Sequence, residues 1–148
     1  MIRIEVPGEP VPQGRPRFSG RGGFVRSYDP PKSRAYKKKV AAAVKEQYHD
    51  EPINYAVHVQ LSIYRPIQKS LSKKEREMRL LGFHRPVVKG DIDNYFKAVT
   101  DACTGLLWVD DAQIVSTKTN KYYSDDPHIE MLVMPADLDL ERSEERRV

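Results

Sequence analysis

Apolar and polar side chains alternate along several short stretches of the chain, the pattern of a strand with one buried face. Residues 1–6 and 56–64 alternate in this way, and residues 113–123 and 129–134 are rich in strand-forming side chains. We predict a strand in each of these four stretches. In the second stretch the apolar positions are Val57, Val59, Leu61 and Ile63.

Apolar residues at helical spacing predict two main helices. The first runs from Pro30-Pro31 to roughly residue 49, and the second from Asp93 to about Thr104. The apolar faces are expected to hold Tyr36, Val40, Ala43 and Val44 in the first helix, and Ile92, Phe96, Val99 and Cys103 in the second.

The proline-rich and glycine-rich segments between these elements predict an arm. Residues 11–18 contain too many prolines for a helix or a central strand. Residues 19–23 form a turn-rich tip between residues 17–18 and residues 24–26, and several arginines flank it. We expect a hairpin that carries arginine side chains.

Two segments stand apart from this core pattern. Residues 65–90 form a long basic connection with a short helical stretch at 72–81, and connections of that length are uncommon unless they are functional or disordered. Residues 136–148 are polar and resemble a flexible tail. We therefore predict one domain over residues 1–135, followed by a C-terminal tail over residues 136–148.

Composition limits the class of protein. A chain of 148 residues is long enough for one hydrophobic core. No apolar run reaches the length that spans a bilayer, and the alternating start of the chain does not resemble a signal peptide. The single cysteine, Cys103, excludes an internal disulfide framework. These features predict a cytoplasmic protein.

Charge is distributed unevenly along the chain. Residues 1–90 carry 19 basic and 8 acidic side chains, a net charge of +11, whereas residues 91–148 carry 6 and 13, a net charge of −7. The total is +4. This distribution is consistent with a polyanion-binding surface beside a carboxylate-rich one. It is equally consistent with a solvated charged surface and an acidic tail.

The carboxylate-rich part contains a pattern suited to metal-dependent hydrolysis. Asp91 and Asp93 precede Lys97, and Asp110-Asp111 follows shortly afterwards. Hard cations such as Mg²⁺ prefer oxygen ligands and keep several waters, so two or three carboxylates suffice. A metal that activates water, with a lysine near the phosphate oxygens, serves phosphodiester hydrolysis well.

Geometry restricts how these residues can act together. Asp91 and Asp93 cannot share a metal inside a regular helix, but they can if Asp91 ends an extended segment and Asp93 caps the helix. If Asp110-Asp111 is extended, only one of the two can point into the site. The structural alternatives are that Asp93 and Lys97 form a surface ion pair and that Asp91 is an ordinary helix cap.

Other residues are weaker candidates. A calcium loop is excluded because Phe96 and Ala102 stand where glycine and glutamate are needed. Cys103 and Trp108 are expected in the core, although base stacking is an alternative for Trp108. The histidines, which we expect on the surface or in strands, show no metal-ligand spacing; they are His49, His58, His84 and His128.

Two ordered motifs closely resemble those of the RusA family of Holliday-junction resolvases. They are DIDNYFKA at residues 91–98, followed by DA at 101–102, and WVDDAQIV at residues 108–115. The opening PGEPVPQGRPRF at residues 7–18 and YDPPKS at residues 28–33 resemble the phage and prophage branch of that family. The resemblance covers roughly residues 1–134.

The resemblance implies a small homodimeric Mg²⁺-dependent endonuclease with an α+β fold, here a mixed sheet with two main helices. Its catalytic aspartates fall on Asp91, Asp93 and Asp111, which would hold Mg²⁺ (or Mn²⁺), and its catalytic lysine on Lys97. Such enzymes nick four-way DNA junctions symmetrically and leave ligatable ends. This chain departs from the pattern in its longer connection after Tyr64 and in Gly90, which replaces an expected arginine.

Three hypotheses for function follow. The first is resolution of four-way junctions, the second a less selective nuclease for branched or flap DNA, and the third a protein that binds junctions without cutting them. Candidate DNA contacts are Arg15, Arg17, Arg21, Arg26, Lys73, Lys74, Arg76 and Lys89. We expect these contacts to read shape through phosphates rather than bases.

Overall fold

A four-stranded mixed sheet forms the centre of the molecule in the computed structural model, which describes residues 1–23, 25–88 and 90–136. The strands are β1 (Ile2–Pro7), β4 (Val57–Pro66), β5 (Ile114–Ser124) and β6 (His128–Pro135), arranged in the order β1-β6-β4-β5. Strand β6 pairs antiparallel with both β1 and β4, whereas β4 and β5 are parallel. The four predicted strands and the mixed sheet are confirmed.

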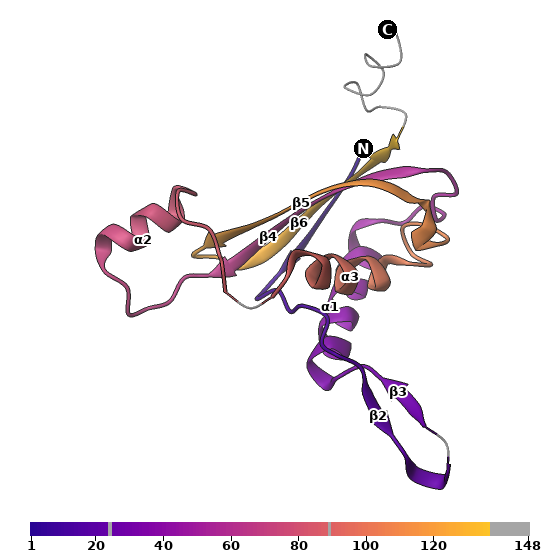
Figure 1. Cartoon of the computed structure of the whole chain (residues 1–148). Coiled ribbons are helices and arrows are strands. Elements are labelled where there is room, and N and C mark those ends of the chain that lie inside the picture. Colours follow the sequence, from indigo (N-terminus) through magenta and orange to yellow (C-terminus); the bar gives the residue numbers. More distant parts are fainter. Residues whose placement is uncertain (24, 89, 137–148) are drawn as a thin grey trace, which may run out of the picture.

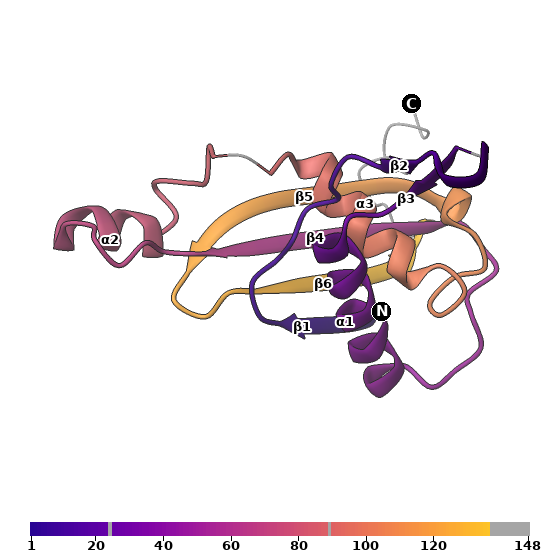
Figure 2. The same cartoon turned by 90° about the horizontal axis from the view of Figure 1, so that it is seen from below.

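Two helices cover one face of this sheet (Figures 1 and 2). They are α1 (Pro31–Gln47) and α3 (Ile92–Cys103), which contact each other and the strands β1 and β5 respectively. Because β4 and β5 are parallel, the chain between them must cross from one end of the sheet to the other, and α3 lies in this crossover. Both main helices and the α+β class are confirmed.

The core lies between the sheet and the two helices. The predicted apolar positions of β4 are fully buried, as are Val40 and Trp108. Trp108 donates its indole N–H to Thr104 Oγ1 at 3.2 Å, which confirms it as a core residue. Ile92 is 41% exposed, so its expected place on the buried face is wrong: it is the first residue of α3 and precedes the turns that pack on the sheet.

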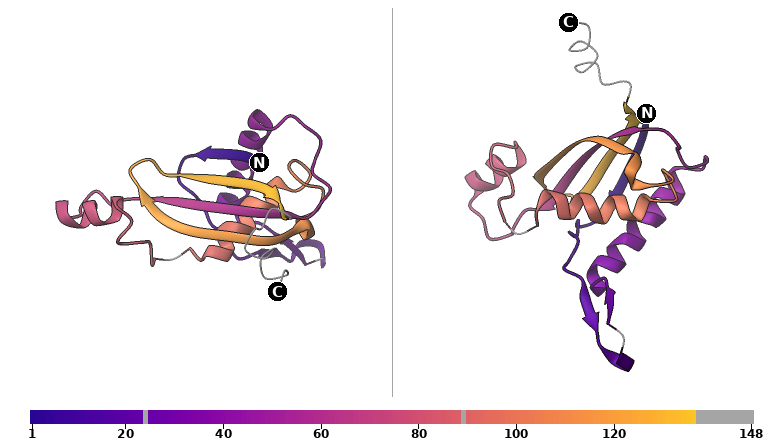
Figure 3. Two further views of the ribbon diagram at one scale, coloured as in Figure 1. Left: turned by 90° about the horizontal axis from the view of Figure 1, so that it is seen from above. Right: turned by 45° about the vertical axis from the view of Figure 1, so that its right-hand side comes forward.

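The opposite face of the sheet carries no helix among the described residues (Figure 3). On this open face the Tyr64 ring stacks between His128 and Tyr122, with ring centroids 4.4 and 5.3 Å away. These three residues belong to the neighbouring strands β4, β6 and β5, so the stack crosses the sheet.

The predicted hairpin is confirmed as an arm that projects from the body of the molecule (Figure 1). Its strands are β2 (Arg17–Ser19) and β3 (Arg26–Tyr28), and the short 3₁₀ turn η1 (Arg21–Gly23) lies at its tip. The second strand begins two residues later than predicted. Gly22 and Gly23 have φ of 75° and 77°, a conformation that glycine adopts without strain, so they account for the tight tip.

The long connection after β4 carries α2 (Lys73–Leu80), which lies beyond the end of the sheet (Figure 1). Ser72 caps this helix by accepting a hydrogen bond from the Glu75 N–H. Cation–π contacts hold the connection to β5: the Arg79 and Arg85 guanidinium groups lie 4.4 and 4.3 Å from the rings of Tyr123 and Tyr122. The short helix predicted at 72–81 is therefore confirmed. Figure 1 shows α2 to the left of α3 and the arm below and to the right of it.

The tail predicted at residues 136–148 lies outside the described residues except for its first residue. Within the described ranges, no helix has the length and apolar character needed to cross a bilayer.

Candidate active site

Asp91 stands at the N-cap position of α3 with an extended backbone (φ −69°, ψ 148°). Its carbonyl accepts hydrogen bonds from the Asn94 and Tyr95 N–H groups at 3.1 Å, so Ile92 is already helical. The expectation that Asp93 caps the helix is therefore wrong, and Asp93 lies in the first turn instead. The Asp91 carboxylate makes no capping hydrogen bond and, among the described residues, no ion pair. An ordinary side-chain cap does not describe it.

The packing around Gly90 explains why glycine stands at this position instead of the arginine that the family resemblance leads one to expect before the first aspartate. Its φ is +113°, and a Cβ atom at this position would lie 2.6 Å from Tyr95 Oη and 2.8 Å from a ring carbon. Tyr95 is buried, so it cannot give way easily. Glycine lets the chain turn tightly over the Tyr95 ring into Asp91. Lys121 Nζ donates to the Gly90 carbonyl at 3.0 Å and ties this turn to β5.

Asp93 and Lys97 lie one turn apart on the exposed side of α3. Within the described residues neither forms an ion pair, so the alternative of a simple Asp93–Lys97 surface pair is not what the structure shows. On a helix with 3.6 residues per turn, Asn94 and Asp101 share the face of Lys97. The buried side chains Tyr95, Ala98 and Val99 lie on the other side.

Lys97 faces a cavity of about 380 Å³ between α3 and the base of the arm, which we call the α3–arm cavity. Helix α3 contributes Asn94, Lys97 and Asp101 to it, and Lys37 comes from α1. The remaining lining residues are Gln13, Gly14, Arg15, Pro16 and Asp29. The proline-rich motif, the YDP motif and the catalytic-type helix therefore meet at one place.

Ion pairs and a hydrogen bond connect the side chains that line this cavity. Lys37 Nζ lies 2.7 Å from Asp29 Oδ2 and 3.4 Å from Asp101 Oδ2, and Gln13 Nε2 donates to Asp29 Oδ1 at 3.0 Å. The hydrogen bond from Lys37 lowers the pKa of Asp29, with burial opposing it and Lys97 adding to it. The sequence patterns did not single out Lys37. Gln13, Asp29 and Asp101 lay in the family-like motifs without an assigned role.

The paired aspartates before β5 have different roles. Asp110 is extended and caps the short 3₁₀ helix η2 (Asp111–Gln113): its Oδ1 accepts from the Ala112 N–H at 2.9 Å, and Gln113 Oε1 accepts from the Asp110 N–H at 2.9 Å. The Ala112 N–H lowers the pKa of Asp110, whereas the adjacent Asp110 carboxyl raises the pKa of Asp111. Asp111 is not extended but begins η2, and it is the member of the pair that lines a cavity.

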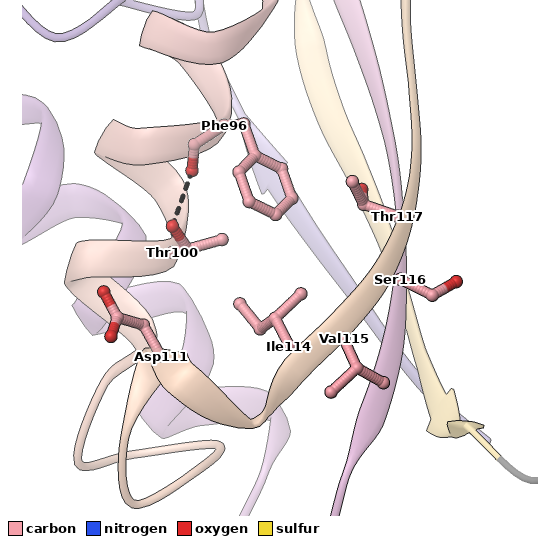
Figure 4. A pocket seen from close by; sticks show the side chains of 7 residues that line it. All are labelled: Phe96, Thr100, Asp111, Ile114, Val115, Ser116 and Thr117. Atoms are coloured by element: carbon pink, nitrogen blue, oxygen red, sulfur yellow. Dashed lines mark hydrogen bonds between the residues drawn. The ribbon is translucent and has the colours of Figure 1, made fainter.

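That second cavity, of about 360 Å³, lies between α3 and β5. Phe96 and Thr100 on α3 face Ile114 and Thr117 on β5, and Asp111 lies at the end nearer Thr100 (Figure 4). Thr100 comes seven residues after Asp93, which is about 10 Å along the helix.

The three aspartates consequently do not converge tightly. Among the described residues, Asp91, Asp93 and Asp111 form no group in which every pair of candidate ligand atoms lies within 4.8 Å. The donor set nevertheless fits a hard cation, because all three side chains are exposed oxygen donors. Mg²⁺ is commonly held by one or two carboxylates, several waters and the phosphates of a substrate.

The candidate DNA contacts fall into two groups. Arg15, Arg17 and Arg26 are exposed at the base and on the strands of the arm, and Lys73 and Lys74 are exposed at the start of α2. In contrast, Arg76 is paired with Asp125. Arg21 lies in η1, where its side chain is not described, and Lys89 lies outside the described residues; both stay predictions.

Comparison with known proteins identifies the family. The model of the family described as endodeoxyribonuclease RusA matches residues 7–134, which include Asp29, Asp91, Asp93, Lys97 and Asp111. The chain belongs to the RusA endodeoxyribonuclease family. It is also 42% identical over 134 residues to "Uncharacterized protein YqaN" of Bacillus subtilis (strain 168), across 89% of this chain and 94% of that protein. Membership of the RusA family supports an endodeoxyribonuclease of the Holliday-junction resolvase type, which acts on branched DNA in recombination.

Proposed function

We propose that the chain resolves four-way DNA junctions by paired symmetric nicks in a Mg²⁺-dependent reaction. The observation that carries this proposal is the state of the α3 N-terminus, where Asp91 and Asp93 are exposed and Lys97 follows one turn after Asp93. Within the described ranges none of the three forms an ion pair. Free carboxylates next to a free cation are ready for a metal and a phosphate, whereas mutually paired ones would first have to separate.

The aspartates and the lysine have distinct roles in this proposal. Asp91 and Asp93 would hold Mg²⁺ or Mn²⁺ with the scissile phosphate, and Asp111 would complete the ligand set from the β5 side. When bound, the metal supplies an activated water and neutralises charge on the phosphate. Lys97 stabilises the additional negative charge that develops on the phosphate oxygens in the transition state.

The positions of Gln13, Asp29 and Lys37 support a positioning role beside Lys97. The Asp29 and Asp101 carboxylates hold Lys37 Nζ at the cavity wall. The two carboxylates and the ammonium group of Lys37 line the same cavity as Lys97. The Lys97 ammonium therefore experiences both negative and positive charge there. We propose that this network keeps the Lys97 ammonium at the rim of the cavity, where a phosphate can reach it.

Two exposed basic regions suit a branched substrate. The arm carries Arg17 and Arg26 together with Phe18, which is 68% exposed, and α2 carries Lys73 and Lys74 on the other side of α3. A duplex that contacts both regions would pass over the N-terminus of α3. We propose that phosphate contacts to these regions provide most of the affinity.

A two-fold homodimer would supply the second active site that symmetric cleavage needs, because one chain offers one such carboxylate stretch. We propose this assembly on the family resemblance and on the symmetry of the substrate. Light scattering at micromolar concentration should give a mass near twice the 17.0 kDa of one chain.

One cleavage experiment tests the proposed function. Synthetic four-way, Y-shaped and linear DNA are incubated with the protein in Mg²⁺ or in EDTA, with Asp93→Asn as the inactive control. Paired symmetric nicks in the four-way junction alone support the proposal. Equal cutting of Y-shaped DNA would favour the less selective nuclease, and tight binding without Mg²⁺-dependent cutting would favour the junction-binding protein.

A further inference from the structure

Three potential metal ligands meet on the open face of the sheet, away from α3. Glu5 on β1 is directly opposite Glu130 on β6 in the strand register, and His128 precedes Glu130 by two residues on the same face. His128 Nε2 lies 3.2 Å from Glu130 Oε1 and 3.8 Å from Glu5 Oε1. Among the described residues this is the one group of three in which all ligand atoms lie within 4.8 Å of one another.

The His128 ring is held so that one nitrogen faces the two carboxylates. Its Nδ1 lies 2.6 Å from the Asp126 carbonyl oxygen. A carbonyl can only accept, so Nδ1 carries the proton and donates it. The ring also stacks on Tyr64 at an interplanar angle of 11°, and only 15% of the side chain is exposed. Metal-binding histidines usually have this support, in which the second ring nitrogen donates to a carbonyl or carboxylate.

The negative charge of the two glutamates favours binding of a cation at this cluster. Like charges directly opposite each other on neighbouring strands destabilise a sheet, and Glu5 and Glu130 form such a pair. Arg3 approaches Glu130 at 3.7 Å, but its side chain is 66% exposed, so water screens much of that attraction. Two carboxylates therefore face His128 Nε2, which lies within hydrogen-bond distance of Glu130 Oε1. Without a metal, a proton on Nε2 would supply the cation between them, and a bound metal ion would take the place of that proton.

We propose that Glu5, His128 and Glu130 bind a divalent first-row transition metal ion of the Zn²⁺ type. Ligands about 2.0–2.1 Å from a tetrahedral zinc lie about 3.3 Å from one another. The observed 3.2 and 3.8 Å bracket that value, so small side-chain rotations suffice. An adjoining cavity of about 330 Å³ leaves room for a water as the fourth ligand. The imidazole nitrogen disfavours Mg²⁺, which takes oxygen ligands.

Such an ion would join the edge strand β1 to β6. Strand β1 pairs with β6 alone, and it leads through Pro7 and Gly8 into the segment that reaches the α3–arm cavity. The site is separate from the aspartates on α3, which lie on the covered side of the sheet. The bound ion is expected to stabilise the pairing of β1 with β6. This proposal does not depend on the proposed nuclease function.

Calorimetric titration with Zn²⁺ in excess Mg²⁺ tests the proposal. We expect one Zn²⁺ per chain in the wild type, and binding at least about 10- to 100-fold weaker in His128→Gln and in Glu5→Gln. His58→Gln, on the same face of the neighbouring strand β4, is the matched control and should bind as the wild type does. Asp91→Asn should also bind normally, which separates this site from the catalytic one.

Thermal unfolding gives a second measurement that does not depend on the catalytic state. At a hundredfold excess over its Kd, Zn²⁺ should raise the unfolding midpoint of the wild type and of His58→Gln by roughly 5–10 °C, and should leave His128→Gln unchanged. Glu5→Gln is a safe second variant because the Glu5 side chain is 55% exposed and its loss should not prevent folding. Absence of Zn²⁺ binding in the wild type, or equal binding in the variants, would overturn the proposal.

Discussion

The backbone N–H of Gln13 donates to the carbonyl of Asn94 at 2.9 Å. This hydrogen bond joins the proline-rich segment that leads into the arm to the first turn of α3. The arm, where we propose DNA contacts, is thereby linked through few bonds to the helix that carries Asp93 and Lys97. If the proposed DNA contacts on the arm and the proposed catalytic residues on α3 are correct, this hydrogen bond couples the two parts of the molecule.

Replacing the carboxylates should separate cleavage from binding. Asp91→Asn, Asp93→Asn and Asp111→Asn should each abolish cleavage, because loss of a metal ligand removes activation, while junction affinity stays largely unchanged. Cleavage of labelled junctions and mobility-shift binding measure the two effects. Near-normal turnover in any of these variants would remove that residue from the site.

Asp110→Asn is the matched control for Asp111→Asn. Asparagine is as good an N-cap residue as aspartate and can still accept from the Ala112 N–H, so η2 should persist. We expect a much smaller loss of activity than at Asp111. Equal losses at the two positions would mean that the cap and the cavity-lining carboxylate act together.

Lys97→Ala should lower the cleavage rate by on the order of 10²–10³, because one fixed charge is lost from the transition state. Single-turnover kinetics with saturating enzyme isolate this step from binding. Lys38→Ala, an exposed lysine on α1, is the control and should leave the rate unchanged. An unaltered rate in Lys97→Ala would leave Lys97 without a role in the reaction.

Local patterns predicted most of the fold. The alternation in residues 57–63 and the spacing of Tyr36, Val40 and Val44 reflect burial on one face, and burial determines strand and helix geometry here. The aspartates and Lys97 were likewise found because they lie within one short stretch. Ile92 was misplaced because periodicity cannot locate the point at which a helix begins to pack.

The remaining site residues could not be found from spacing. Gln13 meets Asp29 across 16 positions, and Lys37 meets Asp101 across 64. Glu5 and Glu130 are brought together only by the register of β1 on β6. Such contacts depend on the topology of the sheet, which a single sequence pattern does not encode.

Salt dependence of junction binding should identify the basic residues that contact phosphates. Lys73→Ala with Lys74→Ala should flatten the slope of log affinity against log salt by about 1.8, since each phosphate contact contributes about 0.9. Arg76→Ala should change the slope less, because its guanidinium already pairs with Asp125. Fluorescence anisotropy over a range of salt concentrations measures both. An unchanged slope in the double variant would exclude α2 as a DNA contact.

Gly90→Ala should destabilise the protein, because a methyl group would collide with the Tyr95 ring and alanine disfavours a φ of +113°. Urea unfolding should show a clear loss relative to Gly20→Ala, where nothing lies within 4 Å of an added Cβ. Equal stability of the two variants would contradict the close packing that we describe before Asp91.

The ion pair between Lys37 and Asp29 should make part of the stability depend on pH. The pKa of Asp29 is lowered in the folded chain by the Lys37 hydrogen bond, against about 3.9 for an unfolded aspartate. Its contribution is therefore fully present above pH ~4 and is lost as pH falls through the lowered folded value. Asp29→Asn should be less stable than the wild type at pH 7, and the difference should shrink below pH ~4. Urea unfolding at pH 7, 4 and 3 measures this, with the exposed Asp50→Asn as control. A difference that stays constant with pH would mean that Asp29 acts through packing rather than charge.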